Sequence, residues 1–178
     1  MNEQDRENEL QDKQWELTWD IRRSIRYHMA RQAFFEDFNR VVTGMNVLLS
    51  SSAMAALLSS HMKEFAPWLM FAVAVFNTLD LVIGTSKAAW LHRDLKNRFI
   101  DLEKRFCKTA QVTKENLDEA TAIRLSIESE EPPIFRTLDL VCHNELVEAI
   151  RWTNESEKLE NLKKIPKVKW LLRNIYRY

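Results

Sequence analysis

Two apolar runs decide the fold: VVTGMNVLLSSSAMAALLSS at Val41 to Ser60, and APWLMFAVAVFNTLDLVI at Ala66 to Ile83. Each run is about as long as the stretch that crosses the hydrocarbon core of a bilayer as a helix. Neither run contains lysine or arginine, and only the stretch from His61 to Phe65 joins them. A connector that short predicts an antiparallel helical hairpin over residues 41–83.

A buried pair of helices in a soluble protein is the alternative. The first run carries Thr43, Asn46 and five serines, so it is only mildly hydrophobic. Serine is nevertheless tolerated in membrane helices that pack closely. The lengths of the runs and the restriction of charge to their flanks favour the membrane hairpin.

Basic residues flanking the runs predict the topology. They are Arg22, Arg23, Arg26, Arg31 and Arg40 before the first run, and Lys87, Arg93, Lys96, Arg98, Lys104 and Arg105 after the second. The connector offers only Lys63. Because basic flanks stay on the cytoplasmic side, both termini are expected in the cytoplasm.

The composition favours helices throughout. The 178 residues include 26 basic and 26 acidic side chains, so no net charge attracts nucleic acid or anionic lipid to the whole chain. Two glycines and four prolines leave few turns. We expect an all-α protein, a membrane helical hairpin continuous with a cytoplasmic helical bundle, that folds as a single cooperative unit. Cys107 and Cys142 fall in the cytoplasmic part and should stay reduced.

An amphipathic helix is predicted in the N-terminal segment, residues 1–40. Leu17, Ile21, Ile25 and Met29 recur there at four-residue spacing. They form its expected apolar face.

The segment after the second run, residues 84–178, should hold further cytoplasmic helices. The second membrane helix is expected to continue unbroken from Pro67 to about Thr109 as a stem with apolar residues at near-heptad spacing. These residues are Ala88, Leu91, Leu95, Arg98 or Phe99, Leu102 and Phe106.

Two more helices are predicted beyond the stem. Thr113 can cap the third, which carries Leu117, Ala120, Ile123 and Ile127 inward and ends at Glu130, Glu131, Pro132 and Pro133. The fourth presents Ile134, Leu138, Val141 or Cys142, and Leu146, and polar residues from Thr153 to Lys164 carry it onward. Pro166 then separates a short basic tail.

Asp80 is the hairpin residue that points most directly to a function. An ionisable group inside a membrane helix is costly and usually faces a bundle interior or water. Asn77 lies one turn before it, and Thr43, Asn46 and Ser50 form a polar stripe on the first helix. We interpret these five residues as the lining of a pore, where a ring of carboxylates favours cations.

A polar cluster inside each hairpin is the alternative interpretation, with Asp80 bonded to Asn46 or reaching toward Lys87. Two helices per chain cannot enclose a pore alone. The pore interpretation therefore requires a homo-oligomer, with a tetramer slightly favoured.

The basic tail is a second candidate site, for a ligand or a regulatory contact. Its basic and aromatic residues are Lys163, Lys164, Lys167, Lys169, Trp170 and Arg173. Such residues bind phosphates and stack on bases in single-strand binders. They also rest on anionic lipid where the helix has an apolar face, which Val168, Leu171, Leu172 and Ile175 supply. Membrane lipid or simple packing is favoured over a nucleotide.

Enzymatic motifs are missing from the sequence. It has no phosphate-cradling glycine loop, no HExxH and no nucleophile elbow. Cys142, His143 and Glu145 are close in sequence, but adjacent helical residues point about 100° apart, which favours structural roles over a metal site. We expect no catalytic residues, no cofactor and no metal.

The motifs along the chain resemble those of a known family. They are Ile25-Arg26-Tyr27-His28 with Arg31 and Phe34-Phe35, then Ala89, His92, Leu95, Arg98-Phe99 and Leu102, then Glu130-Glu131-Pro132-Pro133 and Cys142-His143-Asn144-Glu145. With the two apolar runs, this pattern from about Trp15 to Leu162 resembles the SLATT family of bacterial and phage two-helix membrane proteins. Members are found beside nucleotide-signal synthetases and SLOG sensor domains.

The resemblance implies a pore-forming effector of antiviral conflict systems, placed in the host inner membrane. Its pore would be gated through the cytoplasmic helices by a nucleotide or oligonucleotide signal that a partner nucleotidyltransferase makes. Two rival functions stay open. A holin-like phage lysis protein is also a small two-span oligomer, and a non-conducting membrane anchor or scaffold needs no polar stripe in its hairpin.

Overall fold

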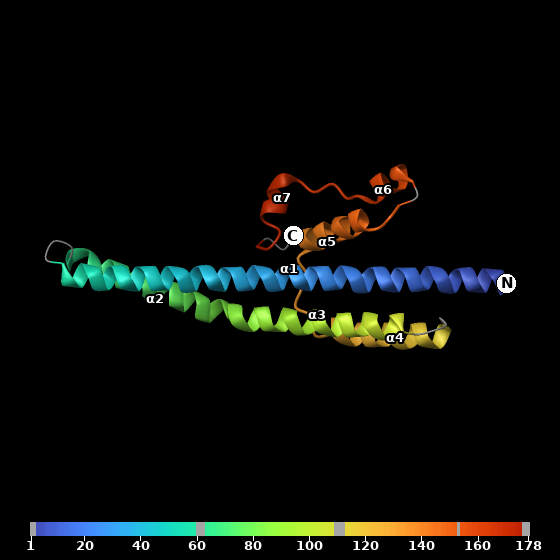
Figure 1. Cartoon of the computed structure of the whole chain (residues 1–178), viewed down its shortest axis with the longest axis horizontal. Helices are drawn as coiled ribbons and strands as arrows, with labels where there is room; N and C mark the ends of the chain where they lie inside the picture. Colours follow the sequence, from blue (N-terminus) through green and yellow to red (C-terminus); the bar gives the residue numbers. More distant parts are fainter. Residues whose placement is uncertain (1–2, 60–62, 109–112, 153, 176–178) are drawn as a thin grey trace. The chain divides into compact units, whose positions relative to one another are not determined.

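The computed structural model describes residues 3–59, 63–108, 113–152 and 154–175, and its regular elements in these ranges are all helices (Figure 1). The expected all-α class is confirmed. The elements are α1 (Glu3–Leu58), the 3₁₀ turn η1 (Lys63–Phe65), α2 (Ala66–Ile83), α3 (Thr85–Cys107), α4 (Lys114–Glu128), α5 (Arg136–Ala149), α6 (Glu155–Asn161) and α7 (Lys167–Leu171). Of the predicted connector, His61 and Met62 lie outside the described residues.

The chain divides into two compact units. One, here called the apolar unit, is Arg31–Leu91, and the other, the charged unit, comprises Met1–Ala30 and His92–Tyr178. The apolar unit extends beyond the predicted hairpin of residues 41–83 at both ends. Cooperative unfolding of the whole chain stays a prediction.

The first helix is longer than its apolar run. α1 covers 56 residues, so the N-terminal segment and the first run form one helix without a break near residue 40. The four prolines of the chain all lie after this helix, so none interrupts its ladder of main-chain hydrogen bonds.

The buried stripe of α1 differs from the four-residue spacing that we expected. Leu17 and Ile21 are buried, as predicted, but Met29 is 53% exposed and His28 is buried instead. A four-residue step turns a helix about 400°, so a stripe at every fourth residue rotates steadily off one face. The face that stays inside alternates steps of four and three residues, which brings His28 into the core.

Gly84 separates α2 from α3, so the predicted unbroken stem is wrong. Its φ of 63° lies in the left-handed region, which glycine adopts readily and which often ends a helix. The main-chain N–H of Gly84 donates to the carbonyl of Asp80 at 2.8 Å, and its carbonyl accepts from Ala88 at 3.0 Å.

The heptad-like spacing on α3 is confirmed, with two substitutions. Its buried positions are Thr85, Ala89, His92, Leu95, Phe99, Leu102 and Phe106. Of the predicted alternatives Arg98 and Phe99, Phe99 is inside. Ala89 and His92 take the places that we gave to Ala88 and Leu91. The imidazole ring of His92 therefore lies among the mainly apolar side chains of this seam.

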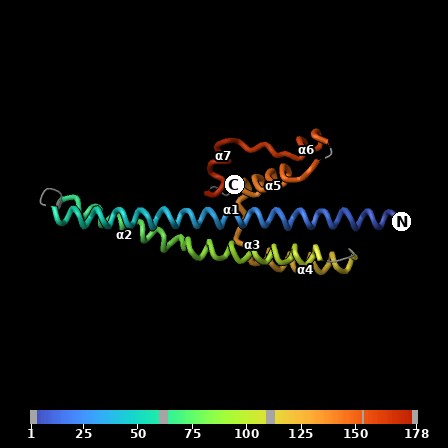
Figure 2. Tube along the Cα trace, in the orientation of Figure 1, coloured from blue at the N-terminus to red at the C-terminus, as the bar shows by residue number. Residues whose placement is uncertain are grey.

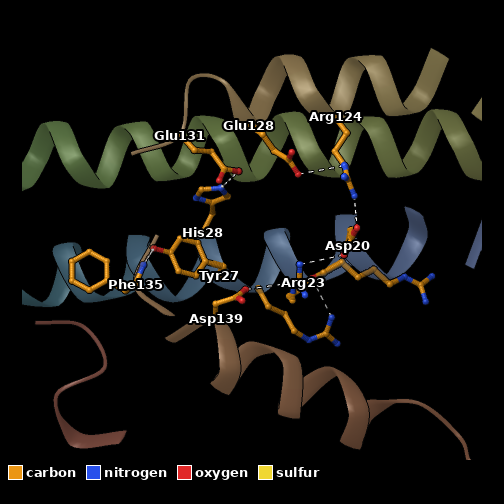
Figure 3. Close-up of polar contacts among 11 residues, drawn as sticks. Asp20, Arg23, Tyr27, His28, Arg124, Glu128, Glu131, Phe135 and Asp139 are labelled. Atoms are coloured by element: carbon orange, nitrogen blue, oxygen red, sulfur yellow. Dashed lines mark hydrogen bonds and ion pairs between the residues drawn. The ribbon is translucent and has the colours of Figure 1, made fainter. Parts of the chain in front are cut away.

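Within the charged unit, α1 lies between α3 and α4 on one side and α5 on the other (Figure 3). Thr113 caps α4 as predicted, with its side chain accepting from the N–H of Asn116 at 3.3 Å. Of the four residues expected to face inward, Leu117, Ala120 and Ile127 are buried.

The C-terminal half of the charged unit ends in two short helices. α5 buries Leu138, Cys142 and Leu146, but it begins at Arg136, so Ile134 precedes it and is exposed. The polar run does not extend α5, because that helix ends at Ala149 and α6 is a separate element. α6 and α7 both contact α5, and the chain runs back between them (Figure 2).

The apolar unit exposes its large apolar side chains, which a protein in water would normally bury. Two helical stretches, within Gln4–Leu58 and Ala66–Cys107, are long and apolar enough to cross a membrane. Large apolar side chains face outward, with Leu81 82% and Trp68 73% exposed. The buried residues of the unit's two apolar runs are small or β-branched: Val42, Ala53, Ala56 and Ala66.

Candidate functional site

Two asparagines link α1 to α2 within the apolar unit. The side-chain N–H of Asn46 on α1 donates to the side-chain oxygen of Asn77 on α2 at 2.8 Å. This hydrogen bond pairs the early part of the first run with the later part of the second run. Among the residues that the structure describes, the Asn46 side-chain oxygen is buried without a partner.

Asp80 has a partner that we did not predict. Its carboxylate accepts a hydrogen bond from the hydroxyl of Thr85, the buried first residue of α3. The contact spans the break at Gly84, where the Asp80 carbonyl also accepts from Gly84. Asp80 thus ties the end of α2 to the start of α3, rather than bonding to Asn46 or Lys87.

The other two predicted pore residues lie on the surface of the unit. Thr43 and Ser50 are both exposed on α1. Ser50 lines a groove of about 260 Å³ between α1 and α2, together with Ala53, Met54, Leu57, Met70 and Val73. The structure therefore joins Asn46 to Asn77, with Asp80 one turn further along α2.

A buried histidine pair is the feature of the charged unit that sequence reasoning missed. The Nδ1 atoms of His28 on α1 and His92 on α3 lie 2.9 Å apart, and the Nε2 of His28 lies 3.0 Å from a carboxylate oxygen of Glu131. Both rings are buried. Phe99 stacks on His28 with 5.7 Å between ring centroids.

A hydrogen bond between these two nitrogens needs one of them to donate its N–H and the other to accept it. The Glu131 carboxylate can only accept, so it orients the N–H of His28 at Nε2. In that tautomer the Nδ1 of His28 carries a lone pair, which can accept from the Nδ1–H of His92. If both Nδ1 atoms carried a proton, two N–H donors would face each other without an acceptor, and the hydrogen bond would be lost.

Arginine bridges connect α1 to both neighbouring layers of the charged unit (Figure 3). Arg124 on α4 pairs with Asp20 and lies 3.3 Å from Glu128. Arg23 on α1 lies 3.2 Å from Asp20 and 3.4 Å from Asp139 on α5.

Two of these carboxyls are partly buried. Burial raises the pKa of Glu128, and it does the same to the pKa of Asp139, although Arg124 and Arg23 respectively oppose the shift. Desolvation therefore outweighs the arginine attraction at both positions.

Tyr27 on α1 and Cys142 on α5 belong to the apolar contact between these two helices. The Tyr27 hydroxyl accepts from the main-chain N–H of Phe135 at 3.0 Å, and its ring packs with Leu138 and Cys142. Burial raises the pKa of the Cys142 thiol to about 12. A thiol held neutral in this way is a core side chain rather than a nucleophile or a metal ligand.

The motif residues after Cys142 hold the basic tail on α5. The Asn144 side chain donates to the Lys163 carbonyl at 2.7 Å and accepts from the Lys163 N–H at 2.9 Å. His143 Nε2 lies 3.0 Å from the carbonyl of Asn161. We call the pair of Asn144 bonds the Asn144 clamp.

The predicted tail residues are mostly exposed. Lys163, Lys164, Lys167, Lys169 and Trp170 all project from the surface of the charged unit. Arg173 lies over the Trp170 ring, 4.2 Å from its centroid. Tyr176 and Tyr178, which end the tail, lie outside the described residues.

Within the described ranges, no group of three or more His, Cys, Asp and Glu residues is arranged to hold a metal ion. Comparisons with models of protein families, with curated proteins and with solved structures find no match. The function is therefore argued from the residues themselves.

Proposed function

We propose that the protein is a two-span membrane effector whose copies assemble into an ion-conducting pore. The observation that carries this proposal is the hydrogen bond between Asn46 and Asn77, which joins the two apolar runs. Polar side chains at this depth are rare in membrane helices, and they usually face other helices or water.

Exposed apolar side chains support the membrane part of the proposal. A soluble protein rarely leaves so continuous a surface of leucine, valine and aromatic residues in contact with water. The basic residues on both flanks, with Lys63 alone in the connector, favour an inner-membrane protein with both termini in the cytoplasm.

Unmatched polar groups support assembly into a homo-oligomer. Thr43 and Ser50 expose their hydroxyls on the surface of α1, where another copy of the chain can reach them. A polar atom without a partner is expensive in hydrocarbon. Neighbouring copies around a water-filled path supply the missing partners, and Asp80 adds a negative charge near that path.

The resemblance to the SLATT family supports a role in antiviral defence with a nucleotide-type signal. Residues from separate motifs of that resemblance meet in this structure: His28, His92, Phe99 and Glu131 share one buried cluster. Contacts among motif residues are expected when a motif maintains a shared fold.

A non-conducting membrane anchor is the second candidate, and the Asp80–Thr85 hydrogen bond favours it. A carboxylate that secures a helix break needs no ion path. No observation in the structure favours the holin-like function over these two.

Conductance of the purified full-length chain in planar bilayers tests the proposal. Asn77→Leu keeps the approximate size of the side chain and removes the polar pair, so we expect loss of conductance or of the oligomer. Asp80→Asn should reduce cation preference. Thr78→Val is the matched control, because the Thr78 hydroxyl is exposed and already bonds the carbonyl of Ala74 within its own helix at 2.8 Å.

Two results would contradict a pore. A wild-type chain that inserts but passes no current supports the anchor. Conductance that is identical in wild type, Asn77→Leu and Asp80→Asn would place any ion path elsewhere.

A further inference from the structure

The C-terminal tail has an exposed apolar face. Val168, Leu171, Leu172 and Ile175 follow the i, i+3, i+4, i+7 spacing of one helix face. Three of them are mostly exposed: Val168 69%, Leu171 72% and Ile175 71%.

Main-chain hydrogen bonds keep these four residues on one face although α7 is short. The N–H of Leu172 bonds the carbonyl of Val168 at 3.1 Å, and the N–H of Ile175 bonds that of Leu172 at 2.9 Å. The helical turn therefore continues past Leu171 as far as Ile175. The apolar face is a property of the folded tail and not of an extended strand.

The charged residues of the tail are all basic. From Lys163 to Ile175 the chain carries five basic residues and no acidic one. Lys163, Lys164, Lys167 and Lys169 are exposed. Lysine can lay its methylenes along an apolar surface while its ammonium group reaches headgroup phosphates.

We propose that this tail docks on the anionic lipid surface of the membrane that the apolar unit spans. An exposed apolar face in a tail whose own charged residues are all basic matches an interface of acyl chains and negative headgroups. Trp170, half exposed beside the face, suits the headgroup level. The inference rests on the membrane insertion in the proposed function, but not on conduction.

α6 provides a built-in comparison. It also exposes a large apolar residue, Leu159, which is 64% exposed. The helix carries Glu155, Glu157 and Glu160 against one basic residue, Lys158, so its net charge is negative and anionic lipid repels it. If apolar exposure alone caused docking, both α6 and α7 would bind lipid. If basic charge is also needed, only α7 would bind.

A polarity-sensitive fluorophore on the full-length chain in nanodiscs tests the docking. The Cys107→Ser background removes the exposed native thiol and leaves buried Cys142. Val168→Cys carries the probe, and Leu159→Cys is the matched control. Discs of phosphatidylcholine alone are compared with discs that also contain phosphatidylglycerol.

We expect the probe at 168 to shift to the blue in the anionic discs only, and the probe at 159 to stay unchanged in both. Replacing the four lysines with glutamine should weaken docking by about fivefold for each lysine. This variant should still fold, because the four side chains are exposed and Asn144 holds Lys163 by its main chain.

Each contrary outcome overturns a distinct statement. A chain that enters both discs but shows no lipid-dependent shift at 168 overturns the docking alone. A shift at 168 caused by an added oligonucleotide in neutral discs, without one in anionic discs, assigns the tail to a nucleotide instead. A chain that enters neither disc overturns the membrane insertion on which both proposals depend.

Discussion

The Nδ1 atoms of His28 and His92 face each other at 2.9 Å inside the charged unit. His92 occupies a core position of the α3 seam, where an apolar residue would be usual. The pair is tolerated there because the two Nδ1 atoms face each other within hydrogen-bond distance and the Nε2 of His28 faces Glu131. Polar specificity on an apolar seam fixes the register of packed helices.

Replacing His92 tests this pairing. His92→Leu leaves the buried Nδ1 of His28 without its partner, so we expect a loss of about 1–3 kcal/mol in unfolding free energy. His92→Asn places an amide atom where Nδ1 was and should lose less. Denaturant unfolding of the full chain in detergent, followed by circular dichroism, measures both variants. Equal losses would show that ring volume, rather than the hydrogen bond, matters at this position.

The two glycines provide a pair of substitutions with opposite expected signs. Gly84→Ala forces an alanine into a φ of 63°, which should cost about 1–2 kcal/mol. Gly44→Ala lies inside α1, where alanine is the better helix former by about 1 kcal/mol. A new Cβ at either position meets no atom within 4 Å, so the backbone alone decides the outcome.

The same unfolding measurement in detergent checks the glycine pair. Stabilisation by both alanines would mean that α2 and α3 form one helix and that the break at Gly84 carries little free energy.

Asp139 and Glu130 should change the pH dependence of stability in opposite directions. The pKa of Asp139 is raised by burial, so its contribution is present below its ordinary pKa and is lost as the pH rises through the folded value. The pKa of Glu130 is lowered, mainly by its hydrogen bond with Arg98, so its contribution is present above its ordinary pKa and is lost as the pH falls.

Unfolding free energies measured between pH 3 and pH 6, a range set roughly around the ordinary carboxyl pKa values, compare Asp139→Asn and Glu130→Gln with wild type. Relative to wild type, Asp139→Asn should gain stability as the pH rises, and Glu130→Gln should lose it. Parallel profiles for the three proteins would contradict the assigned environments.

The two cysteines should react very differently with a maleimide. Cys107 is exposed, whereas Cys142 is buried with its pKa raised to about 12. Mass spectrometry after brief labelling near neutral pH should therefore find one modified thiol in the native chain and two in denaturant. Fast labelling of both thiols in the native chain would indicate that α5 leaves the charged unit readily.

An impermeant thiol reagent applied to intact cells extends this measurement to topology. Lys63→Cys in the connector should be labelled from outside, and native Cys107 should not. Labelling of Cys107 alone would reverse the proposed orientation.

Regular features of the chain were predictable from its sequence. The Thr113 cap, the end of α4 before Pro132 and the α3 seam each follow from local spacing and side-chain chemistry. These features depend on neighbours within a few residues. The class of fold was therefore accessible without knowledge of tertiary contacts.

The contacts that define the candidate site depend on pairing between distant residues. His28 and His92 are 64 residues apart, and Asn144 and Lys163 are 19 apart. Gly84 follows Asp80 by one helical turn, and an isolated glycine is tolerated within a helix. The sequence therefore did not indicate the helix break at Gly84, and without that break the hydrogen bond between Thr85 and Asp80 could not be predicted. Histidine on a core face was the available signal for the buried pair, because a polar ring on such a face requires a partner.

The Asn144 clamp also limits how far the apolar face of the tail can lie from α5. It fixes the main chain at Lys163, and Val168, the first residue of the apolar face, follows five residues later. Five residues span at most about 18 Å when fully extended. If the tail is docked on headgroups, the side of α5 that carries Asn144 therefore lies within that distance of the bilayer surface. Adding a few residues between Lys164 and Pro166 would increase the largest possible distance between α5 and the bilayer in proportion.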